Sequence, residues 1–203
     1  MRYLKTLCLA AVAATALMAS VGAAGASAAT AMCTEVKGDA CSGSILGANT
    51  EFEYQLEKGT SLKLNNGVTI LECNEAYTGG FTTAESGEPL MASGLEAGME
   101  CPTSTEMLGQ PWKAAFSRTT GGNGTVTLTS STEAELGWRE TIPYPPYYPC
   151  ERRAPSIVLD FKGGAPAKLV AANEILKGKK CGELKVSGTF QFATPNPLFL
   201  GSL

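Results

Sequence analysis

Strict alternation of apolar and polar side chains is the feature that most constrains how this chain can fold. The segment from Thr50 to Glu57 reads T-E-F-E-Y-Q-L-E, so that every second side chain is apolar. Successive side chains of a β-strand point to opposite faces, and this spacing therefore predicts a strand with one buried face. The same alternation returns at Leu62 and Leu64 after the turn residues Lys58 and Gly59, and Val68 to Cys73 follow Asn65-Asn66-Gly67.

Further strands are predicted along the rest of the chain. The clearest hairpin pairs Trp112 to Arg118 with Thr125 to Ser131, because Gly121-Gly122-Asn123-Gly124 between them tolerates left-handed backbone conformations. The other strand candidates are Leu136 to Glu140, Ser156 to Lys162, Lys168 to Ala172 and Glu183 to Phe192. We therefore expect an all-β fold, an antiparallel β-sandwich or irregular barrel of about 8 to 10 strands.

Two segments do not follow the alternation. Glu85 to Gly98 and Ala171 to Lys177 contain alanine, leucine and glutamate, so we expect at most a turn or two of helix in each. A third segment, Thr141 to Pro155, carries five prolines around Tyr144, Tyr147 and Tyr148. Because proline fixes φ and removes an amide donor, this segment is predicted to be an extended loop and not a central strand.

The N-terminus has the pattern of a secretory signal peptide. Arg2 and Lys5 precede an apolar run from Leu7 to Ala19, and Ala26-Ser27-Ala28 offers a small-residue cleavage site. The run is shorter than a membrane span needs, and no later segment is long and apolar enough to be one. We therefore expect a signal peptide over residues 1–28, a single secreted or extracytoplasmic β domain over residues 29–203, and no membrane span.

Six cysteines remain after the predicted cleavage. Outside the cytoplasm such thiols oxidise, and an even number permits complete pairing, although six cysteines allow 15 connectivities. We favour pairing in sequence order, because a short loop and two loops of about 30 residues would each restrict the unfolded chain. The expected disulfides are Cys33–Cys41, Cys73–Cys101 and Cys150–Cys181.

Composition excludes several kinds of chemistry. The chain has no histidine and no C-x-x-C, so the usual zinc ligand sets and the Ser-His-Asp and Cys-His nucleophilic arrangements are missing. We expect no catalytic residue, no metal site and no cofactor. The net charge of −3 becomes more negative when Arg2 and Lys5 leave with the leader, and this disfavours a nucleic-acid partner.

Two groups of residues remain candidates for a function. Pairs of carboxylates can hydrolyse glycosides, and Glu51 with Glu53 and Glu133 with Glu135 lie on shared strand faces, where solvated charge is the simpler interpretation. Exposed aromatic rings could bind a sugar or a protein, and the candidates are Trp112, Trp138, Tyr144, Tyr147 and Tyr148. The simpler interpretation is that both tryptophans are core residues and the tyrosines pack the proline-rich loop.

The C-terminal segment resembles a group of bacterial proteins. Cys181 to Leu200 reads C-G-E-L-K-V-S-G-T-F-Q-F-A-T-P-N-P-L-F-L, and an N-G-T-V-T-L-T-S-S stretch begins at Asn123. A cysteine, an alternating strand and a T-P-x-P-L ending resemble many uncharacterised secreted proteins of high-GC soil bacteria. The resemblance implies a bacterial, exported β domain, and it implies no activity.

The sequence leads to three functional hypotheses. The first is an exported, non-catalytic structural or interaction domain of unknown ligand, with a cell-envelope protein or glycan as a possible partner. The second is a glycan-binding module that uses exposed aromatic residues, and the third is a two-carboxylate glycosidase.

Overall fold

The computed structural model describes residues 28–141, 149–178 and 181–203, which form strands and contain no helix. The strands are β1 (Thr30–Cys33), β2 (Val36–Lys37), β3 (Ala40–Cys41), β4 (Glu51–Leu56), β5 (Leu62–Asn65), β6 (Ile70–Cys73), β7 (Glu75–Thr82), β8 (Ser86–Gly87), β9 (Leu90–Glu100), β10 (Thr105–Leu108), β11 (Trp112–Arg118), β12 (Gly124–Ser130), β13 (Leu136–Thr141), β14 (Pro149–Ala154), β15 (Ile157–Lys162), β16 (Lys168–Gly178), β17 (Gly182–Thr194) and β18 (Phe199–Ser202).

Eight of these strands close into an antiparallel barrel. Their order is β16-β15-β12-β11-β9-β7-β4-β17, and pairing between β17 and β16 completes the ring. The predicted hairpin is present, because β11 and β12 pair from Trp112 with Ser130 to Arg118 with Gly124. The all-β prediction is therefore confirmed, and a barrel rather than a sandwich is formed.

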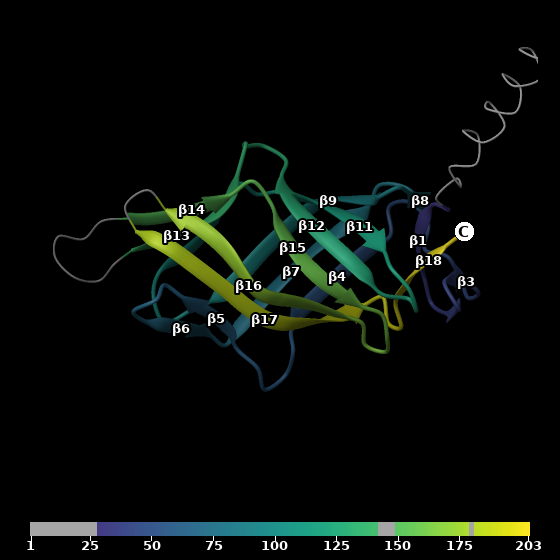
Figure 1. The fold of residues 1–203 in the computed structure, drawn as a ribbon, viewed down its shortest axis with the longest axis horizontal. Coiled ribbons are helices and arrows are strands. Elements are labelled where there is room, and N and C mark those ends of the chain that lie inside the picture. Colours follow the sequence, from purple (N-terminus) through teal and green to yellow (C-terminus); the bar gives the residue numbers. More distant parts are fainter. Residues whose placement is uncertain (1–27, 142–148, 179–180) are drawn as a thin grey trace, which may run out of the picture.

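The barrel wall forks at one end. The β16–β17 hairpin is longer than its neighbours, and Figure 1 shows it running along much of the molecule. β15 pairs with the first residues of β16, whereas β14 pairs with β16 at Lys177. On the other side β4 pairs with the end of β17, whereas β5 pairs with its Lys185–Ser187 segment. Five strands, β10, β13, β14, β5 and β6, thus extend the sheet beyond the barrel, and we call this the forked end.

A small second sheet lies at the other end. Its order is β2-β3-β18-β1-β8, and Figure 1 shows it on the side of the C-terminus, away from β5, β6, β13 and β14. The amide of Leu200 in β18 donates to the carbonyl of Gly122 in the β11–β12 turn. Leu198 and Leu200 are fully buried and belong to the same hydrophobic cluster as the barrel interior. The small sheet therefore caps one end of the barrel.

Aromatic side chains fill the middle of the barrel. Phe52 contacts the rings of Tyr54, Phe116 and Phe192, and Phe161 contacts Phe116 and Phe192. These five rings come from four barrel strands, and most pairs have the tilted or edge-to-face geometry that aromatic rings prefer. The alternation around Tyr54 thus places one face in the core, as predicted.

The three expected disulfides are present. Cys33–Cys41 lies within the small sheet, Cys73–Cys101 joins the end of β6 to the residue after β9, and Cys150–Cys181 joins β14 to the β16–β17 turn. The last two link strands of the forked end to barrel strands. Disulfides persist in oxidising compartments, so the three pairs indicate an extracytoplasmic setting.

Two local predictions are wrong. The segments expected to contain helical turns belong to β9 and β16, where neighbouring strands on both sides outweigh helix propensity. The second half of the proline-rich segment is also not a loop, because β14 runs from Pro149 to Ala154 between β13 and β16. Pro149 is tolerated as the first residue of the strand. Residues 1–27 of the predicted signal peptide and residues 142–148 of the loop lie outside the described residues.

Candidate functional site

The aromatic residues selected from the sequence do not form an exposed site in the described structure. Trp112 and Trp138 are 3% and 2% exposed, and the Trp112 indole donates to the Leu108 carbonyl at 3.1 Å. Both are core residues, which agrees with the simpler interpretation of these two side chains. Tyr144, Tyr147 and Tyr148 lie outside the described residues.

Two other aromatic residues are exposed on the outer surface of the barrel. Tyr77 is 58% and Phe81 42% exposed, and both belong to β7. They line an open groove of about 660 Å³ over β4, β7 and β9. This groove, lined by Glu51, Glu53, Tyr77, Gly79, Phe81 and Glu96 among others, is called the acidic groove below.

Strand register arranges the acidic groove in rows. Glu53 pairs with Gly79, and Gly79 pairs on its other side with Glu96. Tyr77 and Phe81 lie two residues before and after Gly79 and therefore share its outer face. A glycine floor thus lies between two aromatic residues along β7 and between two carboxylates across the sheet.

Glycines on β9 leave room for both rings. A Cβ atom at Gly98 would lie 2.5 Å from the Tyr77 ring, and one at Gly94 would lie 2.5 Å from Cε1 of Phe81. Gly94 also has a φ of 68° at an irregularity in the strand, where glycine is strongly preferred. The two rings therefore lie over the backbone of the neighbouring strand and leave Gly79 uncovered.

The carboxylates of the groove have no partner in the described part of the chain. No hydrogen bond or ion pair joins Glu51, Glu53 or Glu96 to a described residue. Beside the groove Glu75 of β7 pairs directly with Glu100 of β9, and like charges in this position repel each other. The face is therefore an area of uncompensated negative charge with two exposed aromatic rings.

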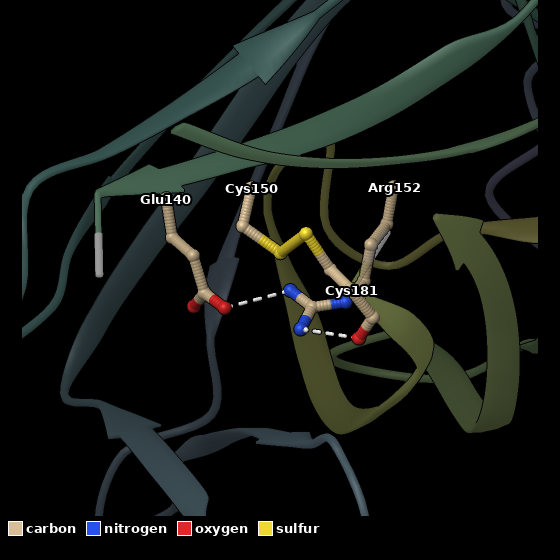
Figure 2. The surroundings of a disulfide bond; sticks show 4 residues. All are labelled: Glu140, Cys150, Arg152 and Cys181. Carbon is tan, nitrogen blue, oxygen red and sulfur yellow. Dashed lines mark hydrogen bonds and ion pairs between the residues drawn. A yellow bond between two sulfur atoms is a disulfide. The ribbon is translucent and has the colours of Figure 1, made fainter. Parts of the chain in front are cut away.

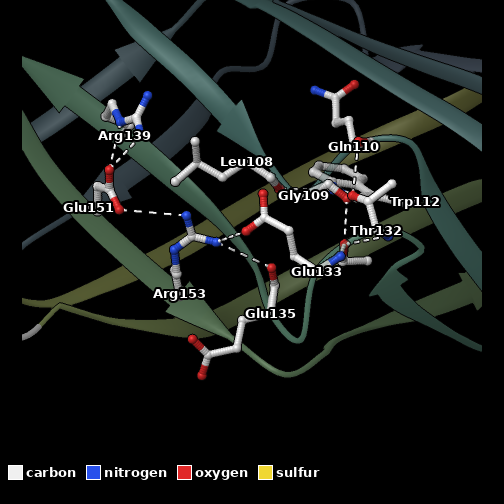
Figure 3. Close-up of polar contacts among 11 residues, drawn as sticks. Leu108, Gly109, Gln110, Trp112, Thr132, Glu133, Glu135, Arg139, Glu151 and Arg153 are labelled. Atoms are coloured by element: carbon white, nitrogen blue, oxygen red, sulfur yellow. Dashed lines mark hydrogen bonds and ion pairs between the residues drawn. The ribbon is translucent and has the colours of Figure 1, made fainter.

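The second acidic pair selected from the sequence is used differently. Glu133 forms an ion pair with Arg153, and the main-chain carbonyl of Glu135 accepts a hydrogen bond from the same guanidinium (Figure 3). Glu133 is thus bound to a strand of the forked end, and this contact explains its position without catalysis.

A wider ion-pair network surrounds this contact. Arg139 contacts Glu151 through Nε and Nη2 at 2.8 and 2.6 Å, and its Nη1 reaches Glu106 at 2.6 Å. The Arg139 guanidinium lowers the pKa of Glu151, and Glu151 in turn raises the pKa of Arg139. The network joins β10, β13 and β14, so its position indicates a structural role.

A buried ion pair lies beside the Cys150–Cys181 disulfide (Figure 2). The Arg152 side chain is 2% exposed, and its Nη1 is 2.7 Å from Oε1 of Glu140. Arg152 Nη2 also donates to the Cys181 carbonyl at 3.2 Å. Because the Arg152 and Glu140 side chains are partners of each other, this site also indicates a structural role.

The described residues contain no cluster of three or more histidine, cysteine, aspartate or glutamate side chains arranged to hold a metal ion. Within the same ranges, no helix has the length and apolar character needed to cross a membrane. No protein-family model, curated protein or solved structure matches the chain.

The sequence pattern of the acidic groove could have been recognised in part. The sequence identifies Glu51 and Glu53 as one of two acidic pairs, but it does not identify Tyr77, Phe81 or Glu96 as members of the same surface. The segment from Glu75 to Thr82 reads E-A-Y-T-G-G-F-T, where the larger aromatic residues alternate with small ones. In a strand this pattern places the small residues in the interior and the aromatic rings on the outer face, so the sequence indicates the exposure of Tyr77 and Phe81. The sequence does not indicate that Glu96 pairs with Gly79 across the sheet.

Proposed function

We propose that the chain is an exported, non-catalytic interaction domain of bacterial origin that acts after a leader over residues 1–28 is removed. The acidic groove is its contact surface. The observation that carries this proposal is the convergence of three unpartnered carboxylates and two exposed aromatic rings on one glycine-floored face.

The chemistry of the groove favours a positively charged partner. Glu51, Glu53 and Glu96 would attract a cation, and the faces of Tyr77 and Phe81 would add cation–π attraction of about 0.5–1 kcal/mol each at an exposed site. A basic peptide segment of a cell-envelope protein supplies such groups on an extended chain that can lie along the groove. Attraction between exposed charges is screened by salt, so this binding should weaken as ionic strength rises.

Binding of a fluorescent lysine-rich peptide tests the proposal. The Glu53→Gln, Glu96→Gln double variant should lose at least ten-fold in affinity, and the same peptide with acetylated lysines should bind weakly to the wild-type protein. The control is Glu72→Gln, because Glu72 is exposed but already paired with Lys63 at 3.5 Å. Equal binding by the double variant and the control would overturn the proposal.

Glycan binding is a second candidate for the same surface. The exposure of Tyr77 and Phe81 beside Gly98 and Gly94 supports it, because exposed aromatic rings can stack on sugar rings. Pull-down on insoluble polysaccharides and peptidoglycan distinguishes this candidate, since it should be insensitive to salt and lost in a Tyr77→Ser, Phe81→Ser variant. A Tyr147→Ala, Tyr148→Ala variant tests the tyrosines predicted from the sequence.

The matched control for the aromatic variants removes two other exposed apolar side chains. Val158 and Ile175 are 43% and 44% exposed on other strands of the barrel. A Val158→Ser, Ile175→Ser variant should retain binding. A broad glycosidase screen covers the third hypothesis, and turnover that disappears in Glu53→Gln would replace the interaction domain with an enzyme.

A further inference from the structure

Two asparagines of the chain, Asn66 and Asn123, are followed directly by glycine. In such a pair the main-chain nitrogen of the glycine can attack the side-chain amide carbon of the asparagine, because glycine has no side chain to hinder the approach. The two reacting groups are covalently tethered, so the reaction needs no enzyme. Whether it occurs depends on how the fold holds the two groups, and the structure treats the two sites differently.

Asn66 and Gly67 lie in the turn that joins β5 to β6, and Figure 1 shows this hairpin at the forked end. Gly67 is exposed and has a φ of 86°, and a Cβ atom placed on it would meet nothing within 4 Å. Its amide donates to Oδ1 of Asn65 at 2.8 Å and belongs to neither strand. The nucleophilic nitrogen therefore has open surroundings, and solvent can reach it.

Three hydrogen-bond donors converge on the Asn66 side-chain oxygen. Oδ1 of Asn66 accepts from the main-chain amides of Val68 at 2.9 Å and Thr69 at 2.8 Å, and from the Thr69 hydroxyl at 3.3 Å. When a nucleophile attacks Cγ of Asn66, negative charge develops on this oxygen. Donors already directed at the oxygen stabilise that charge, as an oxyanion hole does in acyl-transfer enzymes. In the described structure no hydrogen bond holds Nδ2, the leaving nitrogen.

Asn123 is held in an unreactive arrangement. Its Nδ2 donates to the Thr120 carbonyl at 3.2 Å, and its Oδ1 accepts from the Gly163 amide at 3.1 Å. Gly124 is buried in β12, which pairs with β11 on one side and with β15 on the other. The main chain at Gly124 is fixed between two strands, so its nitrogen cannot move toward the neighbouring side chain unless the sheet opens.

We propose that Asn66 is a site of spontaneous deamidation and that the surrounding turn promotes the reaction. The Gly67 nitrogen loses its proton to solvent and forms a bond to Cγ of Asn66. The Cγ–Nδ2 bond then breaks, and Nδ2 leaves as ammonia after taking a proton from water. A water molecule opens the resulting cyclic imide at either carbonyl, which gives aspartate or isoaspartate.

Both products change the β5–β6 turn. Each adds one negative charge at position 66, and no group is oxidised or reduced. In isoaspartate the main chain also gains a methylene group, and the oxygen that accepted from Val68 and Thr69 becomes part of the main chain. The modified protein is therefore more acidic, and anion-exchange chromatography separates it from the original form.

Peptide mapping of the folded protein, incubated at mildly alkaline pH, compares the two sites in one sample. Cleavage after glutamate gives a peptide of residues 58–72 that contains Asn66 and a peptide of residues 107–133 that contains Asn123. Tandem mass spectrometry measures the deamidated fraction of each over time. Asn66 should react at least about ten-fold faster, because Asn123 must first break two hydrogen bonds. Equal rates, or a faster reaction at Asn123, would overturn the proposal.

The same measurement on unfolded protein, in guanidinium chloride with a thiol reductant, separates the effect of the fold from that of the sequence. The two rates should converge, because both asparagines precede glycine. The rate at Asn123 should rise on unfolding, and the rate at Asn66 should not. A rate at Asn66 that is higher in the unfolded chain would show that the turn protects the side chain, and it would refute the promoting role.

A pair of variants tests the donor set around Oδ1. Thr69→Val removes the hydroxyl and keeps the branched shape, and it should slow deamidation of Asn66 about three-fold, because this hydroxyl is the most distant of the three donors. Thr69→Ser keeps a hydroxyl and should react like the wild-type protein. Circular dichroism and the melting temperature establish that both variants fold. Equal rates in the two variants would exclude the hydroxyl from the reaction.

Discussion

Removing one partner of the buried Arg152–Glu140 pair should destabilise the protein more than any single change on its surface. In Glu140→Gln the Arg152 guanidinium stays in an interior where its side chain is 2% exposed and its Nε already has no partner. The Cys181 carbonyl is its remaining hydrogen-bond acceptor among the described residues. Charges about 4 Å apart attract by about 4 kcal/mol at an effective dielectric constant of about 20.

Breaking a buried pair costs about 3–5 kcal/mol, and we expect about 3 kcal/mol here because glutamine keeps an acceptor and the Glu140 side chain is 14% exposed. Urea unfolding at pH 7 with the disulfides intact measures the effect. With a slope of about 2 kcal/mol per M, the midpoint should fall by about 1.5 M.

Two comparisons make this prediction refutable. Glu72→Gln removes an ion pair whose side chains are 55% and 54% exposed, and it should cost less than about 1 kcal/mol. Glu140→Leu with Arg152→Met should recover most of the lost stability, because no charge then remains buried. A loss below 1 kcal/mol for Glu140→Gln, or a double variant as unstable as the single one, would show that the interior around Arg152 is more hydrated than its burial implies.

Three further predictions concern the forked end and the acidic groove. The Cys150→Ser, Cys181→Ser variant should lower the free energy of unfolding by about 3.7 kcal/mol, and the Cys33→Ser, Cys41→Ser variant should lower it by about 2.5 kcal/mol. The first loss is larger because that disulfide closes a loop of 31 residues, against 8 for the second. Calorimetry that reverses this order would contradict the loop-entropy argument. Arg139 lowers the pKa of Glu151 from its ordinary value of 4.5, so the stability it contributes is present above that pH and lost as pH falls below it. The difference in urea midpoint between the wild-type protein and Arg139→Gln should therefore shrink below pH 4.5. Gly94→Ala should cost about 1–2 kcal/mol in thermal unfolding because φ is 68° and the new Cβ meets Phe81, whereas Gly47→Ala, in open space, should be neutral.

The sequence predicted most of the barrel strands, but it did not predict β7, β9 or the second half of β16, and β9 and β16 each contain a bulge. Leu90, Ala92 and Leu95 of β9 are all buried, and the spacing changes from two to three where Gly94 adds a residue. In β16 the irregularity falls between Ala172 and Glu174, at Asn173 with its φ of 62°. One inserted residue breaks a period of two, and the result resembles helical spacing. Local sequence carries no separate signal for this, because the bulge is fixed by the partner strands.

The candidate sites were less predictable than the strands because they depend on pairing between distant segments. The disulfides could be predicted, since sequence order is the simplest pairing of six cysteines. The full row of the acidic groove could not be predicted, because Glu53, Gly79 and Glu96 become neighbours only when β4, β7 and β9 pair in their final register. The buried position of both tryptophans was the simpler expectation, and it holds because the forked end supplies the strands that cover them.

The fork in the barrel wall also explains where the chain departs from ordinary packing. In a closed barrel of strands of equal length, the backbone groups are hydrogen-bonded and the side chains fill the interior. The β16–β17 hairpin extends beyond the barrel wall, and there it pairs with β14 and β5 instead of β15 and β4. Five buried side-chain atoms in the described residues have no hydrogen-bond partner, and they belong to Tyr54, Thr78, Thr103, Trp138 and Arg152. Trp138 and Arg152 are cross-strand neighbours in β13 and β14 of the forked end, and Tyr54, Thr78 and Trp138 line a small apolar cavity in the barrel interior. Unsatisfied polar groups lower stability, and sequences keep such departures mainly where function requires them. The forked end is therefore the part of the described interior in which the hydrogen bonding of the protein's own side chains is least complete.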